Sequence, residues 1–154
     1  MGSSAGGAGR LPEEFRAYEA AWNAHDPAAV TSFMTDDVVY EDVGVGQRME
    51  GRSAVQAFIA GMESDVSSDY RLEMGHPLVD GDRFAQAWTL SGTNDRSDPE
   101  MGLPATGHRF EIRGVSFGRL QEGRIAENTD YWNLAGFLMQ LGLMPAQEAP
   151  PAHV

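Results

Sequence analysis

The spacing of hydrophobic residues divides the chain into a largely helical first half and a strand-rich second half. Apolar side chains recur at helical spacing in residues 12–25, in a short stretch after Asp26-Pro27 and in residues 52–64, which predicts three amphipathic helices. Asp26 is a good N-cap and Pro27 suits the first helical position, so the second helix is expected to begin there and to carry Val30, Phe33 and Met34. Residues 134–141 return to helical spacing and predict a last helix.

Alternation of apolar and polar residues predicts strands with one buried face. The expected strands are residues 38–42, 70–79, 83–92, 108–120 and the first half of 123–142. Asp80-Gly81-Asp82 is expected to form a tight hairpin turn, and residues 94–107 a loop of the length usually reserved for a lid or binding loop. Helices gathered early and strands gathered late predict an α+β fold, in which a curved antiparallel sheet wraps around the helices as a cone.

Length and composition are typical of one globular domain. The domain is expected to span residues 11–144, between a flexible leader (1–10) and a disordered tail (145–154). No apolar run approaches the roughly 20 residues that cross a bilayer, so a membrane-spanning chain is not expected. The N-terminal segment lacks the apolar core of a signal peptide, which makes the cytoplasm the expected location.

Charge and residue usage exclude several kinds of chemistry. The formal net charge is -12, from 23 acidic and 11 basic residues, which argues against nucleic acid as a partner because neutralising phosphates requires a basic face. The chain has neither cysteine nor lysine, so a thiol nucleophile, a cysteine-based metal site, Schiff-base chemistry and a P-loop are excluded. The histidines show no metal-ligand spacing, so a metal site is not expected. The GxSxG matches at 2–6 and 114–118 lie in the expected leader and inside the expected strand 108–120, so no nucleophile elbow is present and a serine triad is not expected.

Two carboxylates lie on strand faces where an apolar surface is being built. Asp130 shares a face with Ala126 and Trp132, and Asp42 shares a face with Tyr40. Burying an unpaired carboxylate is costly, so such a residue is either held by partners or chemically active. For Asp130 the residues alone leave both interpretations open.

The expected inward-facing polar residues form a small set: Tyr18, Asp42, Gln86, Ser116, Asn128 and Asp130. Two carboxylates in an apolar cavity can have pKa values pushed apart, so that one acts as a base and the other as an acid. Tyr18 can donate a hydrogen bond to a developing enolate oxygen. The expected apolar, substrate-binding walls are Trp22, Phe58, Trp88 and Trp132. The alternative is an ordinary core with a few satisfied polar groups.

Several stretches of the chain match a known family pattern: FRAYEAAWNAHDPAAV, FMTDDVVYED, EGRSAVQAFI, GLPATGHRFEIRG and GRIAENTDYWNLAGFLMQLG. Through them the chain resembles, from about Glu14 to Gly142, the SnoaL-like polyketide cyclases of the nuclear-transport-factor-2-like superfamily. The resemblance implies a cone-shaped α+β barrel with a deep ligand cavity, no cofactor and often a homodimer. In these cyclases a strand aspartate is the general acid/base of an intramolecular aldol ring closure, and it matches Asp130. Two cyclase histidines fall on Ser116 and near Asn94, which leaves the reaction itself open.

The ketosteroid isomerases are similar to the chain from Tyr18 to Gly51. Their enolate-stabilising tyrosine matches Tyr18, and their general-base aspartate matches Asp42. Their second oxyanion donor, a protonated aspartate, falls on Ser116, which is a weaker donor. This second resemblance implies roles for Asp42 and Tyr18 beside that of Asp130.

The sequence therefore predicts a cofactor-independent cyclase or isomerase that uses acid/base catalysis on a hydrophobic, carbonyl-containing small molecule. A polyketide intermediate of secondary metabolism, as in antibiotic biosynthesis, is the expected substrate. Asp130 is expected to be the main acid/base, Asp42 a second proton-transfer group and Tyr18 a hydrogen-bond donor. The rival is a non-catalytic small-molecule-binding or assembly domain of the same fold. Epoxide opening ranks third, because the Arg-x-Asp pair of limonene-epoxide-hydrolase-like enzymes falls on Trp88 and Leu90.

Overall fold

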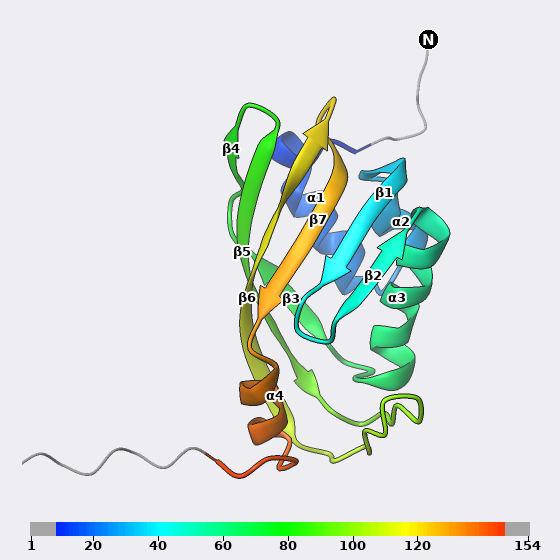
Figure 1. Cartoon of the computed structure of the whole chain (residues 1–154), viewed down its shortest axis with the longest axis vertical. Helices are drawn as coiled ribbons and strands as arrows, with labels where there is room; N and C mark the ends of the chain where they lie inside the picture. Colours follow the sequence, from blue (N-terminus) through cyan, green and yellow to red (C-terminus); the bar gives the residue numbers. More distant parts are fainter. Residues whose placement is uncertain (1–8, 147–154) are drawn as a thin grey trace, which may run out of the picture.

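The computed structural model describes residues 9–146, which form a helical layer against a curved sheet (Figure 1). The helices are α1 (Leu11–Asn23), α2 (Pro27–Thr31), α3 (Arg52–Asp65) and α4 (Leu134–Gln140). The strands are β1 (Met34–Asp42), β2 (Gln47–Glu50), β3 (Arg71–Met74), β4 (Leu78–Asp80), β5 (Arg83–Thr93), β6 (Arg109–Gln121) and β7 (Arg124–Trp132). The predicted leader and tail lie outside the described residues except for 9–10 and 145–146, and Gly9 packs against the ring of Phe33. None of the described helices is long and apolar enough to cross a membrane.

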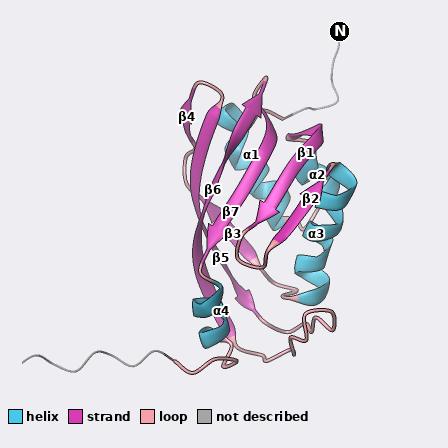
Figure 2. Ribbon diagram, in the orientation of Figure 1, coloured by secondary structure: helices cyan, strands magenta, loops and turns pink. Residues whose placement is uncertain are grey.

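The sheet runs in the order β2-β1-β7-β6-β5-β3, with β4 paired to one end of β5. Helices α1, α2 and α3 lie on one side of this sheet (Figure 2). The α+β cone predicted from the sequence is therefore present, although its sheet stays open instead of closing into a barrel. One strand pair also differs from the predicted antiparallel sheet, because β1 and β7 run parallel with Asp42 opposite Asp130. No hairpin turn joins these two strands, so local sequence does not set their direction.

The helices and strands differ from the predicted ones in several places. Helix α2 stops short of Met34, because Met34 pairs with Ile125 of β7 and the Ile125 amide donates to the Phe33 carbonyl (2.8 Å). Strand β2 is missing from the prediction, since it is short, mostly exposed and lacks apolar alternation. The predicted strand 70–79 is divided into β3 and β4, and Pro77 lies in the interruption, where it removes a backbone donor.

A β-bulge in β7 changes which residues face the helices. The pairing of β6 with β7 shifts register beyond Leu120 and Ile125, and Ala126 is the extra residue. Ile125 is therefore fully buried and lines the interior of the cone. Ala126 is buried as well, and the residue that departs from strict alternation is Ile125, which alternation with Asp130 places on the outer face. Asp130 keeps its predicted inward position.

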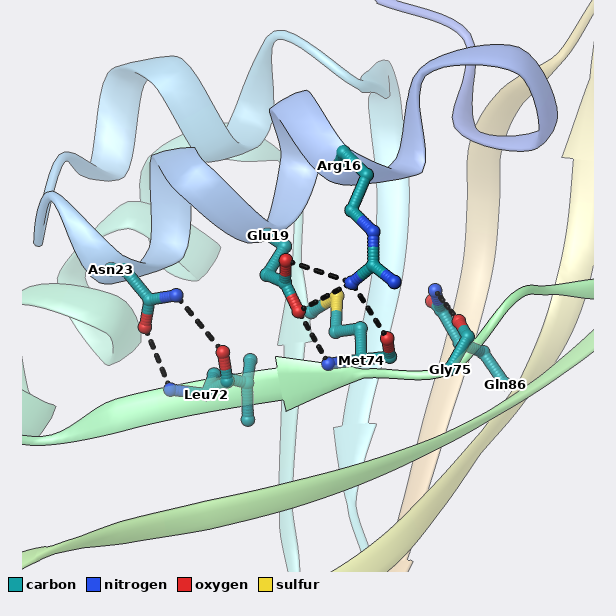
Figure 3. A network of polar contacts seen from close by, with 7 residues as sticks. All are labelled: Arg16, Glu19, Asn23, Leu72, Met74, Gly75 and Gln86. Atoms are coloured by element: carbon teal, nitrogen blue, oxygen red, sulfur yellow. Dashed lines mark hydrogen bonds and ion pairs between the residues drawn. The ribbon is translucent and has the colours of Figure 1, made fainter.

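Side chains of α1 take the place of a neighbouring strand along the edge of β3 (Figure 3). Asn23 accepts from the Leu72 amide (2.7 Å) and donates to the Leu72 carbonyl (2.9 Å). One turn earlier, Glu19 accepts from the Met74 amide (2.7 Å), and Arg16 donates to the Met74 carbonyl (3.2 Å). These contacts satisfy edge groups that would otherwise be free to pair with another chain. They also fix α1 across the sheet, which closes one side of the cone.

Candidate active site

A cavity of about 800 Å³ lies between the inner face of the sheet and the helices. Its volume is within the range of small-molecule sites. Every side chain predicted to belong to the site lines this cavity: Tyr18, Trp22, Asp42, Phe58, Gln86, Trp88, Ser116, Asn128, Asp130 and Trp132. Loop 94–107, predicted to be a lid or binding loop, contributes Met101 and Leu103 to the lining.

Strand pairing arranges the polar side chains in one row across the sheet. Gln86 of β5 pairs with Ser116 of β6, Ser116 pairs with Asp130 of β7, and Asp130 pairs with Asp42 of β1. Neighbouring strands lie about 4.8 Å apart, so the row places the two carboxylates side by side. Their proximity follows from the parallel β1–β7 pair.

Tryptophans form the next row, nearer to α4. Trp88 pairs with Gly114, and Gly114 pairs with Trp132. A Cβ atom on Gly114 would lie 2.2 Å from the Trp88 ring, so glycine leaves the space that this indole occupies. Trp88 Nε1 donates to Ser116 Oγ (3.0 Å), and Trp132 Nε1 donates to Asp42 Oδ1 (2.7 Å). These predicted apolar walls therefore also act as hydrogen-bond donors.

Asp130 lies at the centre of a hydrogen-bond network. Ser116 Oγ and Asn128 Nδ2 donate to its Oδ1 at 2.6 Å and 2.8 Å, and the Tyr40 hydroxyl makes a short hydrogen bond to its Oδ2. Burial raises the pKa of Asp130 to about 6, against the opposing effect of these hydrogen bonds. The nearby charge of Asp42 adds a smaller increase. Asp130 can therefore exchange a proton near neutral pH.

Asp42 is held by a different set of donors. The Trp132 indole and the Val45 amide both donate to Oδ1, at 2.7 Å and 3.2 Å. Burial raises the pKa of Asp42, and the hydrogen bonds from Trp132 and from the turn amides oppose that increase. A Cβ atom on Gly44 would lie 2.3 Å from the Trp132 ring, so this turn needs glycine for the indole to reach Asp42.

Ser116 and Gln86 are occupied by protein partners. The Trp88 indole N–H can only donate, so the Ser116 oxygen accepts from it, and the ionised Asp130 carboxylate can only accept, so Ser116 donates its own hydrogen to Asp130. The Gln86 amide nitrogen donates to the Gly75 carbonyl at 2.8 Å (Figure 3). Ser116 therefore positions Asp130, and its hydrogen is not available as the oxyanion donor that the ketosteroid isomerase resemblance implies.

Tyr18 enters the cavity from α1. Its ring packs edge-on against Phe33 and Trp22, with ring centroids 5.2 Å and 6.4 Å away. Burial raises the pKa of the Tyr18 phenol above its ordinary value, and the Trp22 indole has a smaller opposing effect. The phenol therefore stays protonated at neutral pH and can donate a hydrogen bond to a ligand.

A comparison with models of protein families shows to which family this chain belongs. A family model of the SnoaL-like domain matches residues 15–128. The chain belongs to the SnoaL-like family. A candidate polyketide cyclase from Pseudomonas putida is 30% identical to it, with 86% of this chain and 98% of that chain covered and a TM-score of 0.68. A search of curated proteins found no match.

Two further solved structures share the fold of the SnoaL-like domain. A Catenulispora acidiphila protein with a ketosteroid isomerase-like fold, in complex with trimethylamine, is 23% identical, covers 90% of this chain and 98% of its own, and has a TM-score of 0.73. TerC, co-crystallised with polyporic acid, is 18% identical, covers 84% and 96%, and has a TM-score of 0.67. Both resemblances predicted from the sequence are thereby confirmed, the ketosteroid isomerase one at the level of the fold.

The predicted site of the SnoaL-like domain lacks a cavity residue that hydrogen-bonds to Asp130. Tyr40 is 3% exposed, lines the cavity and hydrogen-bonds to Asp130. The available signal is its position two residues before Asp42 on the same strand face. Without the pairing of β1 with β7, however, this tyrosine is indistinguishable from an ordinary core residue.

Proposed function

We propose that this SnoaL-like domain is a cofactor-independent cyclase or isomerase that transfers a proton at the carbon next to a carbonyl group. The observation that carries the proposal is Asp130, a buried carboxylate that faces the cavity with a pKa of about 6. Within residues 9–146, no arginine forms an ion pair with Asp130 or Asp42. Only neutral hydrogen-bond donors hold these carboxylates, so no opposite charge offsets the increase in pKa that burial causes.

The proposed substrate is a hydrophobic ring compound that carries a carbonyl group, such as a polyketide intermediate of secondary metabolism. The cavity is lined largely by aromatic and aliphatic side chains, and its volume suits a molecule of several rings. The candidate polyketide cyclase of Pseudomonas putida supports this substrate class. Polyporic acid, the ligand of TerC, supports a ring compound as the occupant of the fold.

Asp130 is proposed to act first as a base and then as an acid. The C–H bond next to the carbonyl breaks, its proton moves to the Asp130 carboxylate, and its electron pair delocalises onto the carbonyl oxygen as an enolate. Tyr18 donates a hydrogen bond to that oxygen. Asp42 is a second proton-transfer group. In isomerisation the proton returns to another carbon of the substrate. In ring closure the enolate carbon instead forms a C–C bond to a second carbonyl carbon, and the proton goes to the alkoxide oxygen that this bond leaves.

The rival proposal is a binding protein that uses the same cavity without chemistry. Two buried carboxylates with raised pKa values argue against it, because an apolar ligand gains nothing from them. A retained acid with a pKa near the working pH is instead a requirement of proton-transfer catalysis.

Hydrogen–deuterium exchange on a simple ketone separates the two proposals. The protein is incubated in D₂O with 1-tetralone, a bicyclic aromatic ketone, and the signals of the hydrogens next to the carbonyl are followed by NMR. We expect exchange that depends on folded protein and saturates with ketone. If tetralone quenches the tryptophan fluorescence of the cavity but exchanges no faster than with unfolded protein, across a panel of ring ketones, the binding protein is favoured.

The proposal extends to a homodimer formed through the outer face of the sheet. Val115, Phe117 and Tyr131 lie on that face with 43%, 49% and 53% of their surface exposed. Val115 pairs with Tyr131 across β6 and β7, and Phe117 pairs with Ala85 of β5, so these side chains form one apolar patch. A second copy of the chain, placed on this patch by a twofold axis, would cover it.

Phe117→Arg is expected to convert the dimer to a monomer. A twofold axis brings the two arginines close to each other in an apolar interface, so dissociation should become easier by at least about tenfold. Light scattering across a concentration series measures the change. Met101→Arg, which adds the same charge on loop 94–107, is the matched control and should leave the dimer intact. A wild-type protein that stays monomeric at high micromolar concentration would contradict the dimer.

A further inference from the structure

Two donors meet at one oxygen of Asp130, and one of them cannot reverse its direction. The Asn128 amide nitrogen carries only hydrogens, and it donates to Oδ1 at 2.8 Å. Ser116 also donates to Oδ1 while Asp130 is ionised, because a carboxylate can only accept, and the Ser116 oxygen accepts from the Trp88 indole at the same time. A proton bound to Oδ1 would require Ser116 to turn its hydrogen away and would leave the Asn128 amide donating to a protonated oxygen. Oδ2 is therefore the favoured site for a proton taken up by Asp130.

The partner of Oδ2 is the Tyr40 hydroxyl, which has one hydrogen and can also accept. When Asp130 is ionised, Tyr40 donates its hydrogen to Oδ2. When Asp130 is protonated at Oδ2, the new O–H donates to the Tyr40 oxygen, and the Tyr40 hydrogen has to point elsewhere. Tyr40 lines the cavity, and its ring packs against Phe58 with centroids 5.6 Å apart. The released hydrogen can therefore serve a ligand in the cavity.

We propose that Tyr40 is a catalytic hydrogen-bond donor that the protonation of Asp130 releases toward the substrate. This inference rests on the proposed role of Asp130 as the base. As the substrate C–H bond breaks, its proton forms an O–H bond at Oδ2 of Asp130, and its electron pair moves to the carbonyl oxygen. The Tyr40 hydroxyl then turns from Oδ2 to that oxygen. When the proton returns to the substrate, Tyr40 donates to the carboxylate again.

Tyr40 thereby supplies a second hydrogen-bond donor for the enolate oxygen, a role that Ser116 cannot fill because it donates to Asp130. Tyr18 of α1 and Tyr40 of β1 line the same cavity, and both feel the charge of Asp130. Together they provide a pair of hydroxyl donors for one enolate oxygen, and the second becomes available only when negative charge has developed there. Interactions that are made in the transition state and not in the ground state accelerate the chemical step.

Other titratable groups near Asp130 and Tyr40 could also make ligand binding depend on pH. Tyr18 of α1 and Asp42 of β1 face Asp130 and Tyr40, whereas α3 presents Phe58 and β6 presents Ser116. The remaining charged residues of the cavity lining are Arg48, Asp65, Asp98 and Glu100. All of them remain in a Tyr40→Phe variant. A pH effect that Tyr40→Phe removes therefore comes from the Tyr40 hydroxyl.

The affinity for 1-tetralone tests the switch, because a ketone accepts hydrogen bonds and donates none. Every tryptophan of the chain lines the cavity, so fluorescence quenching measures binding. At about pH 5 the wild type should bind tetralone about 3- to 10-fold more tightly than at about pH 8, which corresponds to one additional hydrogen bond. Tyr40→Phe should bind with the same weaker affinity at both pH values. Tyr70→Phe removes a buried hydroxyl outside the cavity and should behave as the wild type.

Asp130→Asn gives an independent test that does not depend on the folding of Tyr40→Phe. The introduced side-chain amide would donate to the Tyr40 oxygen permanently, so this variant should bind tetralone at both pH values as tightly as the wild type does at low pH. Weak binding by this variant, or a wild-type pH dependence that survives in Tyr40→Phe, would overturn the switch. A different measurement decides the proposed function: it fails if Asp130→Asn exchanges the ketone hydrogens as fast as the wild type does.

Discussion

Asp130→Asn is expected to slow the exchange of ketone hydrogens by about 10²- to 10⁴-fold, which is the usual contribution of a positioned general base. Asparagine has the same shape as aspartate, so its oxygen can keep the donors Ser116 and Asn128, and its amide can face Tyr40. It cannot take up a proton from carbon. The loss should therefore appear in the exchange rate, while the fold remains and the ketone is bound at least as tightly as by the wild type.

Asp42→Asn is the matched comparison, since it makes the same change in the same cavity one strand away. It should keep most of the exchange rate if Asp130 is the base. Removing the charge of Asp42 also removes one cause of the raised pKa of Asp130, so the rate should begin to rise at lower pH. An Asp130→Asn variant that exchanges within a few-fold of the wild type, beside an inactive Asp42→Asn, would transfer the role of base to Asp42.

The second large effect concerns stability and its dependence on pH. Asp130 has a pKa of about 6 in the folded protein against an ordinary value of 3.8. A pKa raised by folding means that the folded state binds the proton more tightly than the unfolded chain does. Its contribution to stability is therefore fully present below about pH 4 and is lost as the pH rises through about 6. The wild type is expected to lose about 2 to 3 kcal/mol over this interval through Asp130 alone.

Asp130→Asn should remove this loss, because asparagine does not titrate. The free energy of unfolding is measured by urea denaturation for both proteins at about pH 4 and about pH 8. The difference between variant and wild type should shift in favour of the variant by about 2 to 3 kcal/mol between the two pH values. Comparing differences cancels the other titrating groups and the fixed effect of the asparagine side chain. A difference that does not change with pH would show that Asp130 titrates at its ordinary pKa in the folded protein.

Local patterns in the sequence were sufficient for the fold class and for the direction of most cavity side chains. Alternation along 124–132 placed Asp130 and Trp132 on the inner face, and helical spacing placed Tyr18 and Trp22 there. These predictions succeeded because the side-chain period of a strand or a helix is fixed by backbone geometry. Alternation failed at Ile125, which faces the cavity although the period places it outside, because a bulge breaks that period and nothing local marks the extra residue.

Relations between distant segments could not be predicted in the same way. The parallel pairing of β1 with β7 brings Asp42 and Tyr40 to Asp130, although about half of the chain separates these segments. Hydrogen-bond direction was also inaccessible, because the commitment of Ser116 to Asp130 depends on a Trp88 indole that reaches across Gly114. The sequence thus pointed to Asp130, and the structure shows the hydrogen-bond donors that distinguish its two carboxylate oxygens.

Two titrations in one sample test the proposed role of Asp130 most directly. The carbon-13 resonance of the Asp130 carboxyl, assigned by its loss in Asp130→Asn, is followed with pH while the rate of tetralone exchange is recorded. We predict a carboxyl midpoint at about pH 6 and an exchange rate that rises through the same midpoint as the carboxylate forms. An exchange rate that stays constant while the Asp130 carboxyl titrates would contradict proton transfer by Asp130.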